Sequence, residues 1–336
     1  MYKGLFSFLV TEQTWTSGWS PYNHFKMKFI PVILIFLTCY KNCQPSHTGT
    51  YLTPNVLLQQ VRENESVNIN LSCGNHSGDN VSWRHNGNSM NSHGNQIHTV
   101  VKYLKGGNYT CHGAAGNILH YTLVLQQGIG FRNNILVKSS GSEHITCSAR
   151  NFDGKFQCSW QKTSQRKDAE LFHFVVTRAS GQSGNITCSM GVDGSTLSCE
   201  DTAHCPYAEE PGRINLSLYF RSWYRYEEYH RHFFISEIVK PDQLIITKVN
   251  ERNFTWAYPE TWSVPSCYFQ LTFEVKMVHA DQSCDHESKI TKTNERSFLV
   301  PNKKHRRGYK LCVRAQEESS NSIWSDWSFH CESHPQ

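Results

Sequence analysis

Thirteen cysteines in 336 residues constrain this fold more than any other feature of the sequence. So many cysteines, together with nine tryptophans, indicate an oxidising compartment and domains that are cross-linked by disulfides. No long stretch has the hydrophobic period of a helix. We therefore expect the cross-linked units to be built from strands.

The first cysteine pair has a tryptophan between its members. Cys73, Trp83 and Cys111 follow in that order, and Tyr109 lies two residues before the second cysteine. In an immunoglobulin-like sandwich the disulfide joins the two sheets, the tryptophan packs on it, and the tyrosine forms a corner bond. The order predicts an Ig-like domain over residues 44–130 with a Cys73–Cys111 disulfide.

Two further cysteine pairs are close in sequence. Cys147 and Cys158 flank one Asp-Gly dipeptide, and Cys188 and Cys199 flank another. Asp-Gly is a strong signal for a tight hairpin turn, which would bring each pair close enough to bond. We predict two local disulfides within a second unit over residues 131–240.

Short strands with period-two hydrophobicity recur along the whole chain, separated by Gly, Asn and Asp turn signals. The clearest cover residues 67–71, 121–125, 269–275 and 309–315. Pro241 predicts a stiff elbow, after which a third unit runs over residues 241–336. The fold class expected from this pattern is all-β, with several antiparallel sandwiches.

A short apolar segment, residues 29–38, follows two lysines. About ten apolar residues behind a basic flank are typical of a secretory signal, since a spanning helix needs about 20. The alternative is a buried strand. We predict that residues 1–43 are an upstream extension and signal peptide, and that the mature chain is secreted and extracellular.

Glycosylation triplets support secretion. Asn-X-Ser/Thr is the acceptor of N-linked glycans, which mark surface positions in secreted proteins. The triplets begin at Asn64, Asn70, Asn75, Asn80, Asn108, Asn185, Asn215 and Asn253.

The string Trp324-Ser-Asp-Trp-Ser is the most specific motif in the chain. Two indoles on an outer strand face are too apolar to lie in water alone, and cations placed between them would form favourable cation–π contacts. Arg314 and Lys310 share one face of the preceding strand, so we expect them to form a ladder with Trp324 and Trp327. The alternative is that a tryptophan belongs to the core. Because side chains three apart in a strand face opposite sides, at most one of them could.

A module with two local disulfides, followed by a sandwich that ends in Trp-Ser-x-Trp-Ser, resembles the homology region of class I cytokine receptors. Several strings are similar to the shared beta subunits of interleukin-12 and interleukin-23, in collinear order from about residue 60 to residue 331. They lie at residues 107–112, 199–206, 234–242, 256–262, 268–273 and 313–316.

The resemblance implies an Ig-like sandwich followed by two fibronectin type III-like sandwiches, which form a cytokine receptor homology module. It also implies a secreted beta subunit of a heterodimeric cytokine, whose partner is a four-helix-bundle alpha subunit. The heterodimer would engage class I cytokine receptors on cells. The alternative function is a soluble receptor alpha chain that captures a helical cytokine without a covalent bond.

The family's interchain disulfide falls on Cys205 of this sequence. If the cysteines near the signal peptide are removed, an odd number remains, which leaves one without a partner. The count becomes even if Cys43 is retained, and Cys205 could also be free, capped or paired elsewhere. The third unit departs from the family's bridge: Cys331 fits one member, but the other position is near Pro301. The pairing of Cys267, Cys284, Cys312 and Cys331 therefore stays open.

The resemblance also implies a pocket for a basic side chain of the alpha subunit, and this pocket maps to Phe152, Glu209, Tyr268 and Glu317. Aromatic walls and carboxylates can hold a buried arginine. The family's tyrosine near Ser319 is absent and Phe152 lacks a hydroxyl. Each of these positions could instead be ordinary surface.

A basic run at residues 303–307 is typical of a solvated hairpin end. Its alternative role is to bind sulfated glycans such as heparan sulfate.

Nothing in the sequence points to an enzyme or to a cofactor. The nucleophile-elbow, zinc-protease, P-loop and dinucleotide motifs are all absent, and so is Cys-x-x-Cys. His230 and His232 have strand spacing but are expected at the surface rather than at a metal. The net charge of +5 comes from 33 basic and 28 acidic residues, which does not suggest nucleic-acid binding.

Overall fold

The computed structural model describes residues 49–76, 80–128, 133–139, 143–179, 186–204, 212–263, 269–301, 308–320 and 322–332. Within them the fold is all-β, as predicted. The helical segments are single turns: η1 (Ser164–Arg166), α2 (Ile235–Ile238) and η2 (Glu260–Ser263). No helix in the described part of the chain is long and apolar enough to cross a membrane.

Some predictions fall on residues outside these ranges. They concern the signal peptide, one glycosylation triplet, three cysteines, two pocket residues and the basic run. The positions are residues 1–43, Asn185, Cys43, Cys205, Cys267, Glu209, Tyr268 and residues 303–307.

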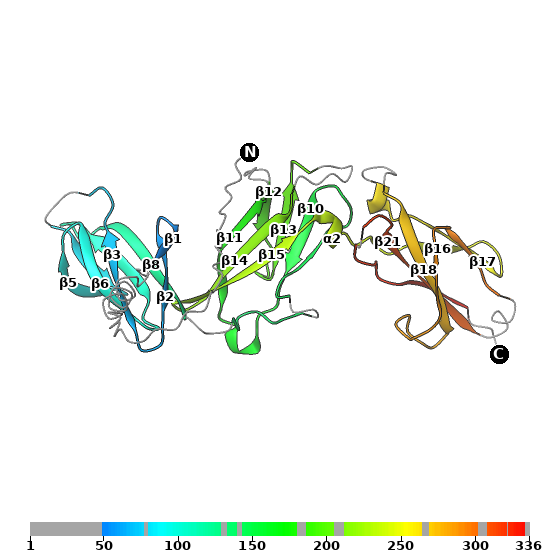
Figure 1. The fold of residues 1–336 in the computed structure, drawn as a ribbon, viewed down its shortest axis with the longest axis horizontal. Helices are drawn as coiled ribbons and strands as arrows, with labels where there is room; N and C mark the ends of the chain where they lie inside the picture. Colours follow the sequence, from blue (N-terminus) through cyan, green and yellow to red (C-terminus); the bar gives the residue numbers. More distant parts are fainter. Residues whose placement is uncertain are drawn as a thin grey trace, which may run out of the picture. The chain divides into compact units, whose positions relative to one another are not determined.

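The first group of strands forms an Ig-like pair of sheets (Figure 1). Its strands are β1 (Thr50–Thr53), β2 (Val56–Val61), β3 (Ser66–Ser72), β4 (Ser82–His85), β5 (Asn88–His93), β6 (Gln96–Lys102), β7 (Gly107–His112) and β8 (Ile118–Gly128). Strands β3 and β6 pair in one sheet, and β5, β4, β7, β8 and β2 are neighbours in the other. The Cys73–Cys111 disulfide joins the two sheets, and Trp83 is fully buried beside it.

Burial raises the pKa of Tyr109, whose ring stacks on His85 at 4.2 Å between centroids.

The second group forms a sandwich of two sheets. Its strands are β9 (Thr146–Ser148), β10 (Lys155–Ser159), β11 (Glu170–Arg178), β12 (Ile186–Met190), β13 (Thr196–Asp201), β14 (Ile214–Ser222) and β15 (Arg225–Phe233). One sheet has the order β12-β13-β10-β9, and the other contains β11-β14-β15. Cys147–Cys158 and Cys188–Cys199 are disulfides between directly opposed residues of neighbouring strands. Buried and half-buried residues alternate strictly along β14. One face of the strand therefore packs in the core and the other points outward.

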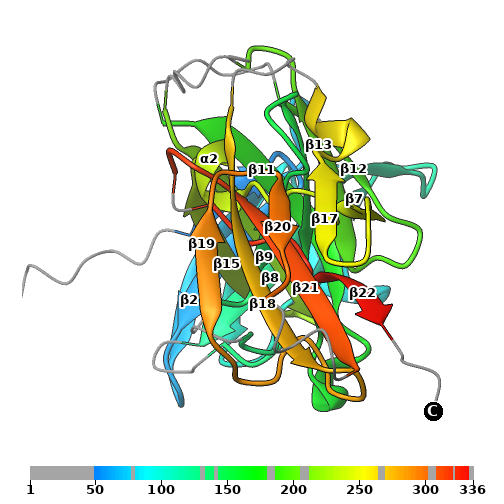
Figure 2. The same cartoon turned by 90° about the vertical axis from the view of Figure 1, so that its right-hand side faces the viewer.

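The third group is also a two-sheet sandwich (Figure 2). Its strands are β16 (Ile245–Lys248), β17 (Asn253–Ala257), β18 (Leu271–His279), β19 (Ile290–Thr293), β20 (Ser297–Leu299), β21 (Tyr309–Glu317) and β22 (Ser328–Glu332). The sheets have the orders β16-β17-β20 and β19-β18-β21-β22. Phe254 and Phe273, both fully buried, come from opposite sheets and fill the space between them.

Gln126 anchors the contact between the first and second groups. Strand β15 pairs in parallel with β8 at Arg225 and Gln126. The Gln126 backbone N–H donates to the Tyr224 carbonyl at 2.7 Å, and its side chain bonds Lys102 and Leu104. The predicted boundary between these units, after residue 130, lies outside the described ranges.

A buried carboxylate fixes the start of the second group. Glu227, 1% exposed, accepts the backbone N–H groups of Asn134 and Ile135 at 2.8 Å each and the Tyr229 hydroxyl at 2.6 Å. Burial and this hydrogen bond raise the pKa of Tyr229. The segment that enters the second group is therefore tied directly to its sheet.

Trp223 lies in the turn between β14 and β15 with φ of 56°, a conformation that bulky residues rarely adopt. Its side chain is 82% exposed, so its burial contributes little. Left-handed φ costs about 1–2 kcal/mol for a residue with a Cβ, whereas glycine loses about 0.5–1 kcal/mol of extra backbone entropy on folding. Trp223→Gly should therefore stabilise the protein by about 0.5–1 kcal/mol, measured as a higher calorimetric Tm.

Tyr224→Gly is the matched control for this prediction. The Tyr224 hydroxyl donates to Asn86 at 2.9 Å, and that contact would be lost. A lower Tm is expected for this variant. A lower Tm for Trp223→Gly as well would show that the tryptophan side chain stabilises the turn.

Candidate functional site

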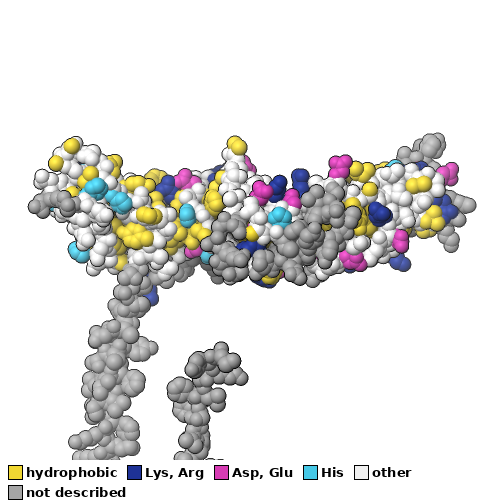
Figure 3. All heavy atoms as spheres, turned by 90° about the horizontal axis from the view of Figure 1, so that it is seen from above, with side chains coloured by type: hydrophobic (Ala, Val, Ile, Leu, Met, Phe, Trp, Pro, Cys, Tyr) yellow, Lys and Arg dark blue, Asp and Glu magenta, His cyan; other side chains and the backbone are white. Residues whose placement is uncertain are grey.

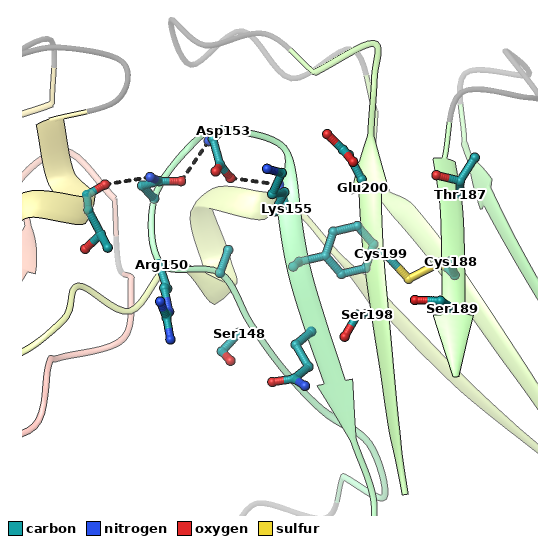
Figure 4. Close-up of a pocket in the computed structure, with 15 residues that line it drawn as sticks. Ser148, Arg150, Asp153, Lys155, Thr187, Cys188, Ser189, Ser198, Cys199 and Glu200 are labelled. Carbon is teal, nitrogen blue, oxygen red and sulfur yellow. Dashed lines mark hydrogen bonds between the residues drawn. A yellow bond between two sulfur atoms is a disulfide. The ribbon is translucent and has the colours of Figure 1, made fainter. Parts of the chain in front are cut away.

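The turn before β10 joins the second and third groups. Phe152 stacks on Phe269 with 3.7 Å between ring centroids and meets Trp262 edge-on at 6.2 Å. Asn151 donates from Nδ2 to the Thr261 carbonyl at 2.6 Å (Figure 4). All three aromatic rings belong to one hydrophobic cluster that runs through both groups. The junction is therefore packed as a core, in which loops of both groups are in contact.

A groove of about 850 Å³ lies beside this junction, on the outer face of the sheet β12-β13-β10-β9 (Figure 4). One row across the strands is uncharged, and the next carries opposite charges. The first row is Ser148, Gln157, Ser198 and Ser189, and the second is Lys155, Glu200 and Thr187. Hydroxyls, an amide and balanced charges along this groove suit hydrogen bonds to another protein surface.

Charged side chains of both signs occur among the described residues of one face of the molecule. Acidic and basic side chains are intermingled on the face that Figure 3 shows. Among the described residues, no group of three or more His, Cys, Asp or Glu side chains could hold a metal ion.

The described members of the predicted pocket lie below the surface. Phe152 is 4% exposed and Glu317 is 1% exposed. Glu317 accepts the backbone N–H groups of Ser319 and Ser320 at 2.8 and 2.5 Å, so its carboxylate holds the turn after β21. Neither side chain presents an open surface to a partner. Both instead support loops at the junction.

Arg314 forms the centre of the tryptophan ladder. Its guanidinium lies 4.9 Å from the Trp324 ring centroid and 4.4 Å from that of Trp327. Nε and Nη2 both donate to Glu274 Oε2, at 2.8 and 2.6 Å, and Glu274 is 5% exposed. The guanidinium therefore forms cation–π contacts with both indoles and charge-assisted hydrogen bonds with the buried carboxylate.

Two lysines that sequence reasoning missed complete the ladder. Lys276 lies 4.5 Å from the Trp327 ring and Lys292 lies 5.6 Å from the Trp324 ring. Burial, followed by the positive charge of Arg314, lowers the pKa of Lys276. The available signal was the alternation of β18, which puts Lys276 and Glu274 on one face.

The prediction for Lys310 is wrong. Its Nζ lies 5.3 Å from the Phe329 ring and donates to the Gln282 carbonyl at 2.6 Å. The reason is register: Lys310 is opposite Cys331, four residues beyond Trp327. Sharing a face with Arg314 therefore does not bring Lys310 to the indoles.

The expectation that Trp324 and Trp327 face opposite sides is also wrong. Both are half-buried and contact the same guanidinium. Strand β22 begins only at Ser328, and buried positions recur every three residues at Ser322, Ser325 and Ser328. A period of three is that of a polyproline II helix, not of a strand.

The third group has one described disulfide, Cys284–Cys312. It lies on the outer face of β18 and β21, where Trp327 packs against it. Cys331 is exposed and, in the described part of the chain, forms no disulfide. Within those residues, Cys331 has no partner for the bridge that the resemblance suggested.

The described glycosylation triplets lie at accessible positions. The asparagine is exposed at Asn64, Asn70, Asn75, Asn80 and Asn108, and half-buried at Asn215 and Asn253. Attachment of sugar at any of them stays a prediction.

Comparisons with known proteins identify the family. The family model described as cytokine interleukin-12p40 C-terminus matches residues 142–222. Interleukin-12 subunit beta of Equus caballus is 30% identical over 254 residues, which cover 68% of this chain and 75% of the relative. The Homo sapiens protein of the same name is 29% identical over the same shares, and that of Mesocricetus auratus is 29% identical over 76% and 84%. All are named as cytokine subunits, in agreement with the absence of catalytic motifs. The chain therefore belongs to the interleukin-12 subunit beta family and is not an enzyme.

Proposed function

We propose that this protein is the secreted beta subunit of a heterodimeric cytokine of the interleukin-12 and interleukin-23 type. It binds a four-helix-bundle alpha subunit at the junction between the second and third sandwiches and is linked to it through Cys205. The observation that carries the proposal is family membership, at 30% identity over three quarters of a relative. The packed junction supports it, because loops that already pack against each other lose less conformational entropy on binding a folded helix bundle.

The contact surface combines the junction loops with the hydroxyl-lined groove beside them. Glu209 and Tyr268 are the members of the predicted pocket that we assign to direct contact with a basic side chain. Phe152 and Glu317 support the loops that carry it, since both are buried. Class I receptors on cells then bind the assembled heterodimer.

Secretion is part of the same proposal. Four disulfides within the described residues fit an oxidising compartment. Glycans at the triplets would lie at the surface. Heparan sulfate is a second candidate partner, through residues 303–307, and salt-sensitive retention on heparin resin tests it.

The Cys205→Ser variant should abolish the covalent heterodimer. Co-expression with candidate alpha subunits should give a reductant-sensitive species on non-reducing gels, and the variant should give separate chains that still co-purify. Cys331→Ser is the matched control, because Cys331 is an exposed cysteine that forms no disulfide with any of the described residues. It should leave the covalent species intact.

The same experiment distinguishes the proposed function from the alternative one, a soluble receptor alpha chain. A soluble receptor alpha chain would capture a helical cytokine reversibly, and no reductant-sensitive species would form with any candidate. Loss of the covalent species in Cys331→Ser instead would move the interchain bond to β22 and refute its assignment to Cys205.

A further inference from the structure

Among the described residues of the sheet β16-β17-β20, those on the outer face are all uncharged. We call this outer face the β17 face and define it by Ile245, Thr247, Val249, Asn253, Thr255, Ala257, Ser297 and Leu299. The opposite side of β17 is fixed in the core, since Phe254 and Trp256 are 0% and 4% exposed. A slip of one residue would expose both aromatic rings, so the register is firmly set.

Large aliphatic side chains lie open on this face. Ile245 is 70% exposed, Val249 57% and Leu299 61%. Strands β16 and β20 are the two edges of the sheet, and Figure 2 draws β20 beside β17. Exposed aliphatic residues beside open strand edges form a template on which other chains can pair and aggregate.

A glycosylation triplet lies on the central strand of the same face, where Asn253 is the first residue of β17. Asn253 is directly opposite Leu299 on β20. On its other side, Val249 donates its backbone N–H to the Asn253 carbonyl at 2.9 Å. Directly opposed side chains are about 5 Å apart at Cβ, so the amide of Asn253 lies between two exposed aliphatic groups. Thr255, the hydroxyl residue of the triplet, is on the same face.

We propose that Asn253 carries an N-linked glycan whose function is to cover the β17 face and keep the third sandwich from self-associating. The inference rests on the proposed secretion, because the sugar is transferred only in the secretory pathway. A branched glycan attached between Val249 and Leu299 is bulky and strongly hydrated, so it would exclude other chains from both edges.

The transfer uses a polyprenyl-diphosphate-linked oligosaccharide as co-substrate. The Asn253 Nδ2 atom forms a bond to C1 of the first sugar, and the bond from C1 to the diphosphate oxygen breaks. The diphosphate leaves on its lipid with the bonding electron pair, and the amide loses one proton. No oxidation or reduction takes place.

The test uses the full chain secreted from a eukaryotic host. Amidase release of glycans in isotopically labelled water, followed by peptide mass spectrometry, should show that Asn253 was occupied. Asn253→Gln should increase the oligomer fraction in size-exclusion chromatography with light scattering several-fold. Asn80→Gln, which removes an exposed triplet in the first sandwich, should leave this fraction unchanged.

A rescue variant tests whether the glycan acts by covering the aliphatic side chains of the β17 face rather than in another way. Val249→Thr and Leu299→Thr, added to Asn253→Gln, replace the open aliphatic groups with polar residues that favour strands. This triple variant should return to the oligomer fraction of the wild type. If Asn253→Gln is not secreted, native amidase treatment of the folded wild type and of the Val249→Thr, Leu299→Thr variant provides the same comparison.

Three results would overturn the proposal. One is an unmodified Asn253 in a protein whose other triplets carry sugar. Another is an Asn253→Gln variant that stays as monomeric as the wild type, and the third is a failure of the threonine substitutions to restore it. A chain in which no triplet is modified would instead refute secretion, and with it the proposed function.

Discussion

Arg178→Met should destabilise the second sandwich by about 3–5 kcal/mol, the cost of leaving a buried charge without its partner. Arg178 ends β11 and Asp201 ends β13, and their side chains are 4% and 0% exposed. The Arg178 guanidinium forms an ion pair with the Asp201 carboxylate and donates to the Gly212 carbonyl at 3.0 Å. Removal of the guanidinium leaves the carboxylate in a site that water cannot reach.

The loss should be visible locally as well as globally. Hydrogen exchange followed by mass spectrometry reports the free energy of opening for each strand separately. The variant should exchange faster in β11 and β13 than in the strands of the first sandwich. A lower urea midpoint of unfolding is the accompanying global change.

Arg221→Met provides the matched control. Arg221 pairs with Glu170 on the neighbouring strand, but these side chains are 34% and 57% exposed. Exposed ion pairs contribute about 0–1 kcal/mol, so this variant should exchange almost as the wild type does. The double variant Arg178→Met, Asp201→Leu removes both charges and should recover most of the loss. A single variant as stable as the control would show that the ion pair is not the source of stability.

The Arg178 site also bears on the proposed interchain bond. Asp201 precedes residues 205–211 and Gly212 follows them, so one guanidinium holds both ends of the segment that carries Cys205. Asp201 further accepts the backbone N–H of Ala203 at 3.0 Å. Release of the two ends should lower the yield of covalent heterodimer in Arg178→Met relative to Arg221→Met.

Local features of this fold could be predicted from sequence because their causes are local. The pairs Cys147–Cys158 and Cys188–Cys199 each lie eleven residues apart across a turn signal. The order of Cys73, Trp83 and Cys111 likewise specifies a known packing arrangement. The all-β fold class, which is confirmed, follows from a period of two repeated along the chain.

Features that depend on register could not be predicted in this way. Lys310 and Arg314 share a face, yet the choice between them depends on which residue of β22 lies opposite each. Lys276 joins the ladder from β18, and the alternation of that strand predicts its face but not which indole it meets. Four cysteines allow three pairings, and the Cys284–Cys312 bond joins β21 to the loop that follows β18, a contact that spacing alone does not specify.

The second large effect is expected for Arg314→Met, which should destabilise the third sandwich by about 2–4 kcal/mol. This loss is smaller than the full cost of breaking a buried ion pair, because the Arg314 side chain is 27% exposed. Glu274, whose side chain is 7% exposed, would lose both hydrogen bonds from the guanidinium. Glu274 would keep an ion pair with Lys292, whose Nζ lies 3.7 Å from Glu274 Oε1 on a side chain that is 70% exposed. Such a partner cannot replace a bidentate arginine. Two cation–π contacts are lost as well, each worth about 0.5–1 kcal/mol at an exposed site.

Lys310→Met is the control that makes this prediction specific to the ladder. Lys310 is on the same strand face and also lies over an aromatic ring, but that ring is Phe329, which is 61% exposed. Loss of the Lys310 ammonium should lower the free energy of unfolding by less than about 1 kcal/mol, because the Phe329 ring remains in contact with water. Thermal unfolding followed by tryptophan fluorescence reports on both variants. Equal destabilisation would mean that the outer face of β21 acts as a general hydrophobic cover, and that the position of Arg314 between two indoles contributes nothing of its own.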